Sequence, residues 1–194
     1  MNISIYTTSN GRNYAKGGEK VNKRETTRML VEAGALIAMA QILSYITIFE
    51  MPMGGSVTPG SMVPILIFAI RWGYKKGLLA GAVYGVLQFI LGPKWSFHPV
   101  SVIFDYPVAF GCLGLAGIFG KKTIGIISGV LLGIFGRLVS HVISGVIVFA
   151  SYAPEGQSPL LYSVTYNGSF LAIEFVISVI LTLLLVKNVK FIRE

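Results

Sequence analysis

The sequence is poor in charged residues and nearly free of cysteine. Asp, Glu, Lys and Arg make up 12% of its 194 residues, whereas soluble domains carry about 25%. Hydrophobic residues make up 54% of the chain, and its mean hydropathy is +0.72. This composition and length indicate one domain embedded in a lipid bilayer. The only cysteine, Cys112, lies in an apolar run and cannot form an internal disulfide, so redox chemistry is unsupported.

Several enzymatic signatures are also absent. The chain has no G-x-x-x-x-G-K-[ST] phosphate-binding loop, no H-E-x-x-H zinc motif and no G-x-S-x-G nucleophile turn. We therefore expect no P-loop ATP binding, no bound metal or cofactor, and no enzyme activity. The formal net charge is +8, but the cations lie between apolar runs, as membrane orientation requires. Nucleic acid is not an expected partner.

Six apolar segments approach the ~20 residues that a helix needs to cross hydrocarbon. They are residues 29–48, 61–74, 77–93, 99–119, 123–151 and 160–186. The pattern predicts an all-α integral membrane protein with six transmembrane helices, forming one membrane domain over residues 29–194. Residues 1–28 are polar and basic and lack the apolar run of a cleavable signal. They are expected to form a flexible cytoplasmic tail.

The distribution of Lys and Arg predicts the orientation. With six spans, both termini lie on one side, and that side collects fourteen cations: Arg12, Lys16, Lys20, Lys23, Arg24, Arg28, Arg71, Lys75, Lys76, Lys121, Lys122, Lys187, Lys190 and Arg193. The other side carries only Lys94. Because cytoplasmic loops carry the excess of Lys and Arg, both termini are predicted to be cytoplasmic.

Polar groups lie at comparable depth in three of the segments. At a rise of about 1.5 Å per residue, Asp105 lies about 9 Å, His141 about 15 Å and Asn167 about 10 Å from the outer ends of their helices. Tyr106 adjoins Asp105, and Tyr162 opens the sixth segment. Polar residues in a span usually face a partner or a cavity. We therefore expect a small-molecule pocket in the outer half of the membrane, although a purely structural bond from His141 to another helix is an alternative.

One face of the fifth segment has a composition suited to a flat ligand. His141, Gly145 and Phe149 are spaced four residues apart, and Tyr152 follows at the next turn. This face offers a polar ring, a gap without a side chain, and aromatic walls. It suits a flat heterocycle, while ordinary packing of aromatic residues is the alternative.

Depth arithmetic also assigns partners to the buried charges. Arg137 and Glu174 both lie about 21 Å from the outer ends of their helices, so Glu174 is expected to pair with Arg137. Asp105 is then left without a partner in the protein. An unpaired carboxylate in hydrocarbon protonates or finds a cation, and an organic cation from outside would serve.

Three further features have two interpretations each. The outer connection 49–61 is rich in Gly and Pro and is either a movable lid or an ordinary loop. Trp95 lies in another outer connection, where aromatic residues are more often interface anchors than ligand contacts. Gly34 and Ala38 are spaced for close approach by another helix, either a partner or a neighbour within the chain.

Five stretches resemble the thiamine-specific substrate-binding subunits of energy-coupling-factor (ECF) transporters, which are bacterial vitamin importers with six membrane helices. The stretches are MPMGGSVTPGSMVPI (51–65), AIRWG (69–73), HPVSVIFDYPVAF (98–110), HVISGVIVFASYAPEG (141–156) and YSVTYNGS (162–169). The resemblance implies a thiamine pocket near the outer face, built from the fourth, fifth and sixth helices and closed by the first outer loop. It also implies a location in the bacterial plasma membrane.

The resemblance further implies roles for individual residues. The implied thiamine-binding set is Trp95, Asp105, Tyr106, His141, Gly145, Phe149, Tyr162 and Asn167. Some relatives carry Glu at the position of Asp105 and Trp at that of Phe149. Gly34 and Ala38 fall on the small-residue motif that docks the transmembrane coupling subunit, and ATP hydrolysis belongs to two partner ATPase subunits.

Two rival functions follow from the same residues. The nearer one is a binding subunit for another vitamin or for a thiamine precursor. The other is an intramembrane enzyme in which His141 and Asp105 act as an acid–base pair, although the sequence shows no nucleophile or metal-ligand motif to accompany them.

Overall fold

The computed structural model describes residues 5–7, 13–15 and 23–188. The chain divides into two compact units, Met1–Gly34 and Ala35–Glu194. In the first unit, β1 (Ile5–Thr7) pairs antiparallel with β2 (Asn13–Ala15), with Tyr6 opposite Tyr14. The helix α1 (Lys23–Ser44) then begins before the predicted start at residue 29, so residues 23–28 of the expected tail are helical. The predicted tail cations Arg12, Lys16 and Lys20 lie outside the described residues.

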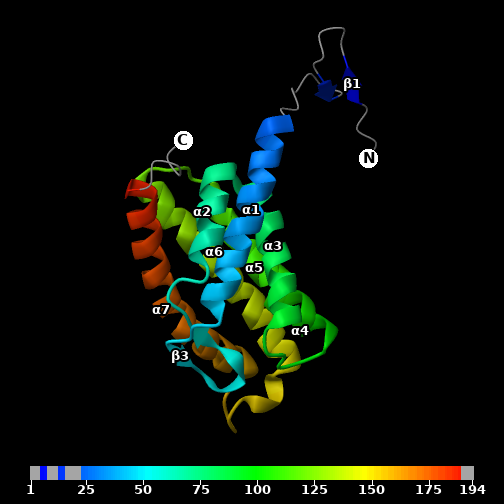
Figure 1. Cartoon of the computed structure of the whole chain (residues 1–194). Coiled ribbons are helices and arrows are strands. Elements are labelled where there is room, and N and C mark those ends of the chain that lie inside the picture. Colours follow the sequence, from blue (N-terminus) through cyan, green and yellow to red (C-terminus); the bar gives the residue numbers. More distant parts are fainter. Residues whose placement is uncertain (1–4, 8–12, 16–22, 189–194) are drawn as a thin grey trace. The chain divides into compact units, whose positions relative to one another are not determined.

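Six helical segments lie within residues 23–188, at the places that the apolar pattern predicts. After α1 come α2 (Val63–Trp72), α3 (Tyr74–Leu91), a composite segment over residues 99–117, α6 (Thr123–Val148) and α7 (Pro159–Asn188). The composite segment consists of α4 (Pro99–Ile103), the π-helical turn η2 (Phe104–Val108), α5 (Ala109–Cys112) and the 3₁₀ turn η3 (Leu113–Gly117). Figure 1 shows α2, α3, α6 and α7 with the composite segment among them.

Four of these segments are long and apolar enough to cross a membrane: residues 23–44, 99–117, 123–148 and 159–188. Their outward side chains are large and apolar, as in Leu131 of α6 and Leu184 of α7, each 53% exposed. Their buried faces carry polar residues, including Ser140, Ser144, Ser178 and Thr182. An apolar exterior around a partly polar interior is the pattern of a protein whose solvent is lipid.

The second predicted span is shorter than expected. α2 has 10 residues, or about 15 Å, which is half of the hydrocarbon thickness. Every residue from Val63 to Ile70 is buried, so this helix is covered by protein on all sides. It packs against α3, α7 and η3. It ends at Gly73, whose φ of 89° allows α3 to begin at once and fold back along α2.

Glycines allow α3 and the composite segment to approach each other closely. Gly77, Gly81 and Gly85 of α3 lie one turn apart, and a Cβ on any of them would meet backbone or Cβ atoms of neighbouring segments within 2.5 Å. Gly114 faces them, and its Cβ would lie 2.0 Å from the Leu78 amide nitrogen. Backbone-to-backbone contact of this kind is how helices gain packing energy in lipid.

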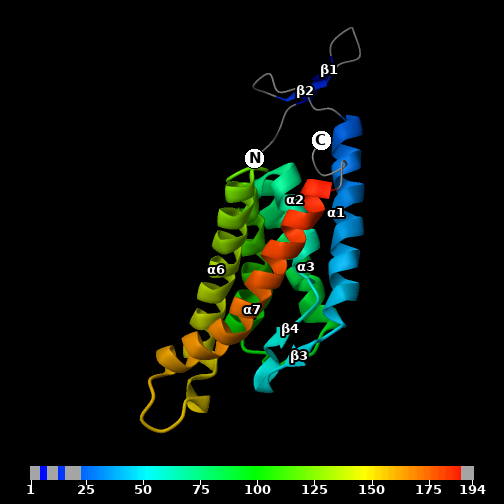
Figure 2. The ribbon, with the colours of Figure 1, turned by 90° about the vertical axis from the view of Figure 1, so that its left-hand side faces the viewer.

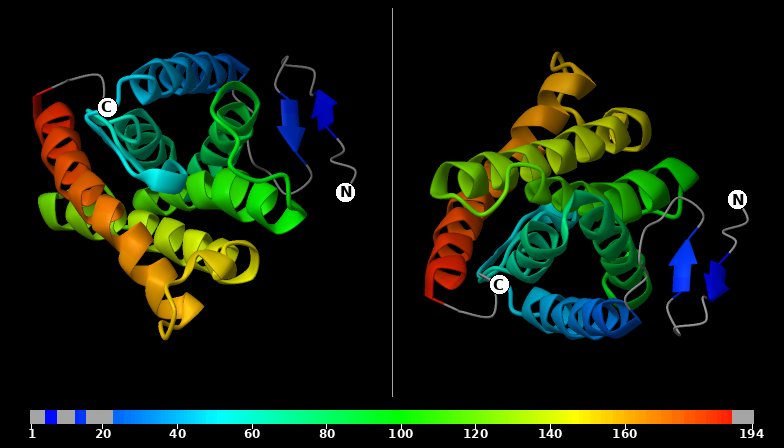
Figure 3. Two further views of the ribbon diagram at one scale, coloured as in Figure 1. Left: turned by 90° about the horizontal axis from the view of Figure 1, so that it is seen from below. Right: turned by 90° about the horizontal axis from the view of Figure 1, so that it is seen from above.

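The first outer loop and the connection between α6 and α7 lie at one end of the second unit (Figure 2). The first outer loop contains β3 (Phe49–Glu50), the 3₁₀ turn η1 (Pro52–Gly54) and β4 (Ser56–Val57), with Phe49 opposite Val57. In Figure 2 this loop lies at the same end of the unit as the connection between α6 and α7. α6 and α7 cross and pack against each other (Figure 3). The second part of α1 joins the same unit through Tyr84, whose hydroxyl donates to the Ala40 carbonyl at 3.2 Å.

The close glycine packing gives a direct test of this arrangement. Gly114→Ala should lower the free energy of unfolding by about 1–3 kcal/mol, because rigid backbone cannot yield to the added methyl group. Gly168→Ala in α7 is the matched control, since no atom lies within 4 Å of its Cβ position. The control should be neutral or slightly stabilising, because alanine favours helix. Thermal unfolding of both variants in detergent would show equal effects if the glycine contact were unimportant.

Candidate functional site

A cavity of about 400 Å³ lies between the first outer loop, α3, the composite segment, α6 and α7. Its volume falls within the range of small-molecule sites. All eight residues singled out by sequence line it: Trp95, Asp105, Tyr106, His141, Gly145, Phe149, Tyr162 and Asn167. The structure thus brings together side chains that are as much as 72 positions apart in the chain (95 to 167).

The π-helical turn η2 presents Asp105 and Tyr106. Pro107 lies inside this turn, and because proline lacks an N–H and clashes with the preceding turn, it favours a local departure from α-helix. Ser140 of α6 donates its hydroxyl to the Phe104 carbonyl at 2.5 Å. Gly85 leaves room for the Tyr106 carbonyl, which a Cβ would approach to 2.4 Å. Such π-turns are frequent at functional sites.

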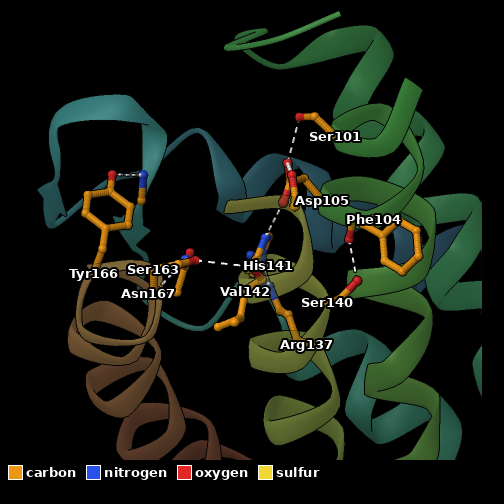
Figure 4. A network of polar contacts seen from close by, with 12 residues as sticks. Ser101, Phe104, Asp105, Arg137, Ser140, His141, Val142, Ser163, Tyr166 and Asn167 are labelled. Atoms are coloured by element: carbon orange, nitrogen blue, oxygen red, sulfur yellow. Dashed lines mark hydrogen bonds and ion pairs between the residues drawn. The ribbon is translucent and has the colours of Figure 1, made fainter. Parts of the chain in front are cut away.

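Asp105 is fully engaged within the protein, which corrects the prediction that it lacks a partner. Its Oδ1 lies 2.8 Å from His141 Nδ1, and its Oδ2 accepts from Ser101 Oγ at 2.7 Å and from Ser144 Oγ at 2.6 Å. Figure 4 shows this network, with Asp105 between Ser101 and His141. The side chain remains 19% exposed. A ligand would therefore meet a carboxylate that is already oriented.

The predicted pairing of Arg137 with Glu174 is wrong. Within the described residues, no ion pair joins them. Arg137 instead donates from Nε to His141 Nε2 at 3.1 Å. Glu174 Oε1 accepts from the amide and the hydroxyl of Thr58 at 2.6 and 2.9 Å. The prediction compared only the depths of residues along their helices and placed the first outer loop outside the bundle. In the structure, Thr58 of this loop is buried and bonds to Glu174.

Gly145 lines the cavity, as predicted for a ligand-facing position, and it also brings two helices together. A Cβ there would lie 2.0 Å from Ser163 Oγ of α7, so the missing side chain allows α6 and α7 to touch. Asn167, one turn beyond Ser163, donates its amide to the Ser163 carbonyl at 2.9 Å. The glycine thus sets how closely the two walls of the cavity approach.

Aromatic residues cover the open end of the cavity. α6 ends at Val148, so Phe149 and Tyr152 do not continue the predicted helical face, yet both line the cavity, with ring centroids 6.1 Å apart. Trp95 is 46% exposed, and its indole lies against Gly54 of the first outer loop. Tyr162 and Tyr166 stack along α7 with centroids 6.0 Å apart.

The first outer loop closes part of the cavity. Glu50, Gly54, Gly55, Ser56, Thr58 and Ser61 of this loop line the cavity. Tyr166 fastens the loop: its hydroxyl donates to the Pro52 carbonyl and accepts from the Gly55 amide at 3.2 Å. Sequence reasoning missed Tyr166, although its spacing of four from Tyr162 placed it on the same face.

Sequence reasoning also missed two groups of polar residues. One is the pair of serines that donate to Asp105, and the other is a series of hydrogen-bonded side chains beside the cavity. In that series, the Gln88 amide donates to Tyr84, Ser44 and Gln41. Small hydroxyl residues give no distinctive sequence signal, but Ser101 is one turn before Asp105 and Ser144 is one turn after His141.

Among the described residues, no cluster of three or more His, Cys, Asp or Glu residues could hold a metal ion.

Comparisons with known proteins connect this site to one family. Residues 30–193 match the family described as Thiamine transporter protein (Thia_YuaJ). The thiamine transporter ThiT of Bacillus subtilis (strain 168) is 35% identical over 180 residues, covering 85% of this chain and 93% of the relative. ThiT of Lacticaseibacillus paracasei is 28% identical over 168 residues, covering 78% and 83%.

A solved structure has the same fold. ThiT from Listeria monocytogenes matches with a TM-score of 0.78 and 26% sequence identity, covering 88% of this chain and 98% of that protein.

Proposed function

Because this chain belongs to the thiamine transporter protein family, we propose that it is the substrate-binding subunit of an ECF-type importer. In this proposal the cavity faces outward and captures extracellular thiamine, and partner ATPases drive uptake. The family membership itself confirms the resemblance to thiamine transporters and a multi-pass membrane setting. The observation that carries the proposal is the gathering of all eight motif residues around one cavity.

The cavity suits the chemistry of thiamine, a cationic thiazolium joined to an aminopyrimidine. Asp105 supplies negative charge for the cation or accepts from the pyrimidine amine. His141, Tyr162 and Asn167 fix the orientation of the ligand. Trp95 and Phe149 offer aromatic faces, which attract cations through the ring quadrupole.

We further propose that all six helical segments cross the bacterial plasma membrane, with both termini cytoplasmic. One side carries fourteen cations and the other only Lys94, which supports this orientation. The fourteen are Arg12, Lys16, Lys20, Lys23, Arg24, Arg28, Arg71, Lys75, Lys76, Lys121, Lys122, Lys187, Lys190 and Arg193. The short α2 crosses together with the buried residues Thr58, Ser61 and Met62 that precede it. The organisms of the named relatives are bacteria, which supports the location.

The partners in this proposal are a transmembrane coupling subunit and two ATPase subunits. Gly34 and Ala38 are exposed on α1, where their small size lets another helix approach closely. The sequence contains no P-loop of its own, which fits a division of labour with ATPase subunits.

Two alternative functions differ from this proposal in their ligand or in their chemistry. A subunit for another vitamin or a thiamine precursor would use the same cavity. An intramembrane enzyme is favoured only by the 2.8 Å contact between His141 and Asp105, which resembles a base with its orienting acid. An enzyme would convert thiamine, whereas a binding subunit would release it unchanged, as mass spectrometry after incubation would reveal.

Ligand identity is the first test of the proposed function. The purified chain, without ATP or partners, should bind thiamine tightly and should not bind riboflavin or biotin, because its cavity combines the oriented Asp105 carboxylate with aromatic walls. Calorimetric titration with the three vitamins measures this. Equal binding of all three, or of none, would remove the thiamine assignment.

Asp105→Asn tests the charge in the cavity. The change keeps the size of the side chain and removes its charge, and it should weaken thiamine binding at least tenfold, which is about 1.4 kcal/mol. An exposed ion pair contributes only about 0.2–1 kcal/mol. Glu155→Gln is the matched control, because Glu155 is an exposed acid between α6 and α7 that does not line the cavity. Similar affinities of the two variants would make Asp105 a purely structural residue.

Gly34→Leu and Ala38→Trp test the docking surface. Each should abolish uptake in reconstituted complexes and leave thiamine affinity intact, because a bulky group holds two helices apart. Met39→Trp, on another exposed part of the same helix, is the control and should transport normally. If both docking variants transported normally, the docking proposal would fail; a joint loss of stability and affinity would place the pair in internal packing.

A further inference from the structure

Arg137 lines the cavity and is held there by three contacts. Its Nε donates to His141 Nε2 at 3.1 Å, and its Nη1 donates to Met62 Sδ at 2.7 Å. Its guanidinium carbon lies 4.3 Å from the centroid of the Phe110 ring, a distance typical of a cation–π contact. Arg137 and His141 are one turn apart on α6, so the helix holds the two groups in register.

These contacts determine which nitrogen of His141 carries the proton. A guanidinium has only donors, and it stays protonated in proteins. His141 Nε2 must therefore present its lone pair to Arg137. The hydrogen of a neutral imidazole then lies on Nδ1, which donates to Asp105 Oδ1 at 2.8 Å. A doubly protonated imidazolium would point an N–H at the N–H of Arg137, with like charges in contact.

We propose that Arg137 is a positioning residue that holds His141 neutral, with its proton on Nδ1, so that Asp105 keeps its charge for a cationic ligand. This inference rests on the proposed function for the identity of the ligand. The protonation state of His141 itself follows from contacts within the protein.

Charged and titratable groups from every neighbouring element define the local balance. Asp105 of η2 and Arg137 of α6 contact His141 directly. Glu174 of α7, Tyr84 of α3 and Tyr106 of η2 line the same cavity. Glu174 is held by Thr58, Tyr106 donates to the Pro93 carbonyl, and Tyr84 donates to the Ala40 carbonyl. Hence His141 is the member of the cluster whose protonation decides the charge next to Asp105.

The charge balance explains why the neutral form favours a cationic ligand. With neutral His141, the imidazole lies between the Arg137 guanidinium and the Asp105 carboxylate and adds no charge of its own. An imidazolium would add one positive charge directly beside Asp105, and that charge would repel a cationic ligand. Such repulsion is strong in a site of low dielectric constant.

The direct test observes the imidazole without any ligand. The chain has 2 histidines, and the exposed His98 is the N-cap of α4. His98→Asn keeps a capping acceptor and leaves His141 as the only signal. Nitrogen NMR of histidine-labelled protein should show a neutral imidazole protonated on Nδ1, unchanged from pH 7.5 to 5.5. A proton on Nε2 alone, or an imidazolium at pH 7, would overturn the proposal.

Arg137→Met tests the cause, because methionine fills the space but cannot donate to Nε2. In this variant His141 should take up a proton on acidification. Thiamine affinity should fall about tenfold between pH 7.5 and 5.5, since free imidazole titrates near pH 6.5 and only the neutral fraction is competent. The parent chain should change less than about twofold. Met62→Leu is the matched control: it removes only the second contact of Arg137 and should leave the His141 signal unchanged.

The outcomes separate this proposal from the function that it refines. If Arg137→Met leaves His141 neutral at pH 5.5, Arg137 does not control the imidazole, and the proposal is overturned. If the parent chain shows the Nδ1 proton but binds no thiamine, the positioning role stands and the thiamine assignment fails. The NMR measurement on the parent chain decides the protonation state even if Arg137→Met does not fold.

Discussion

The scarcity of water within a bilayer is the constraint on which the rest of this structure depends. A carboxylate in that environment must be satisfied by the protein that surrounds it. Asp105 meets this requirement through His141, Ser101 and Ser144, which come from its own segment and from α6. Three donors on one carboxylate hold it in a single orientation before any ligand arrives. The same bonds that make the charge tolerable also make the site preorganised.

Close helix packing is what allows these bonds to form. Gly85 lets α3 lie against the backbone of Tyr106, and Gly145 lets α6 touch Ser163 of α7. Both contacts flank the cavity, so the glycines determine its width. Larger residues at these positions would separate the walls that carry Asp105, His141 and Asn167. Packing and recognition are therefore consequences of the same small residues.

The first outer loop shows how a polar segment can enter an apolar bundle. Thr58 reaches Glu174 through two hydrogen bonds, and Tyr166 holds Pro52 and Gly55 at the rim. Glu174 Oε2 is buried and has no hydrogen-bond partner among the described residues. The loop is thus anchored at a deep and a shallow point, both on α7. Any opening of this loop must break contacts with that one helix.

The sequence alone determined the membrane class, the six helical segments and eight of the residues that line the cavity, because apolar run length and intramembrane polar residues can be recognised locally along the chain. It placed Asp105, His141 and Asn167 at similar depth, since rise per residue is a constant of the helix. It could not determine which groups pair, because pairing depends on how each helix is rotated and on the path of the loops between them. For that reason it did not show that Glu174 bonds Thr58, that Gly145 lies against Ser163 of α7, or that α2 is short and buried. Helix periodicity places Arg137 one turn from His141, but only the tertiary structure brings Asp105 to the other ring nitrogen.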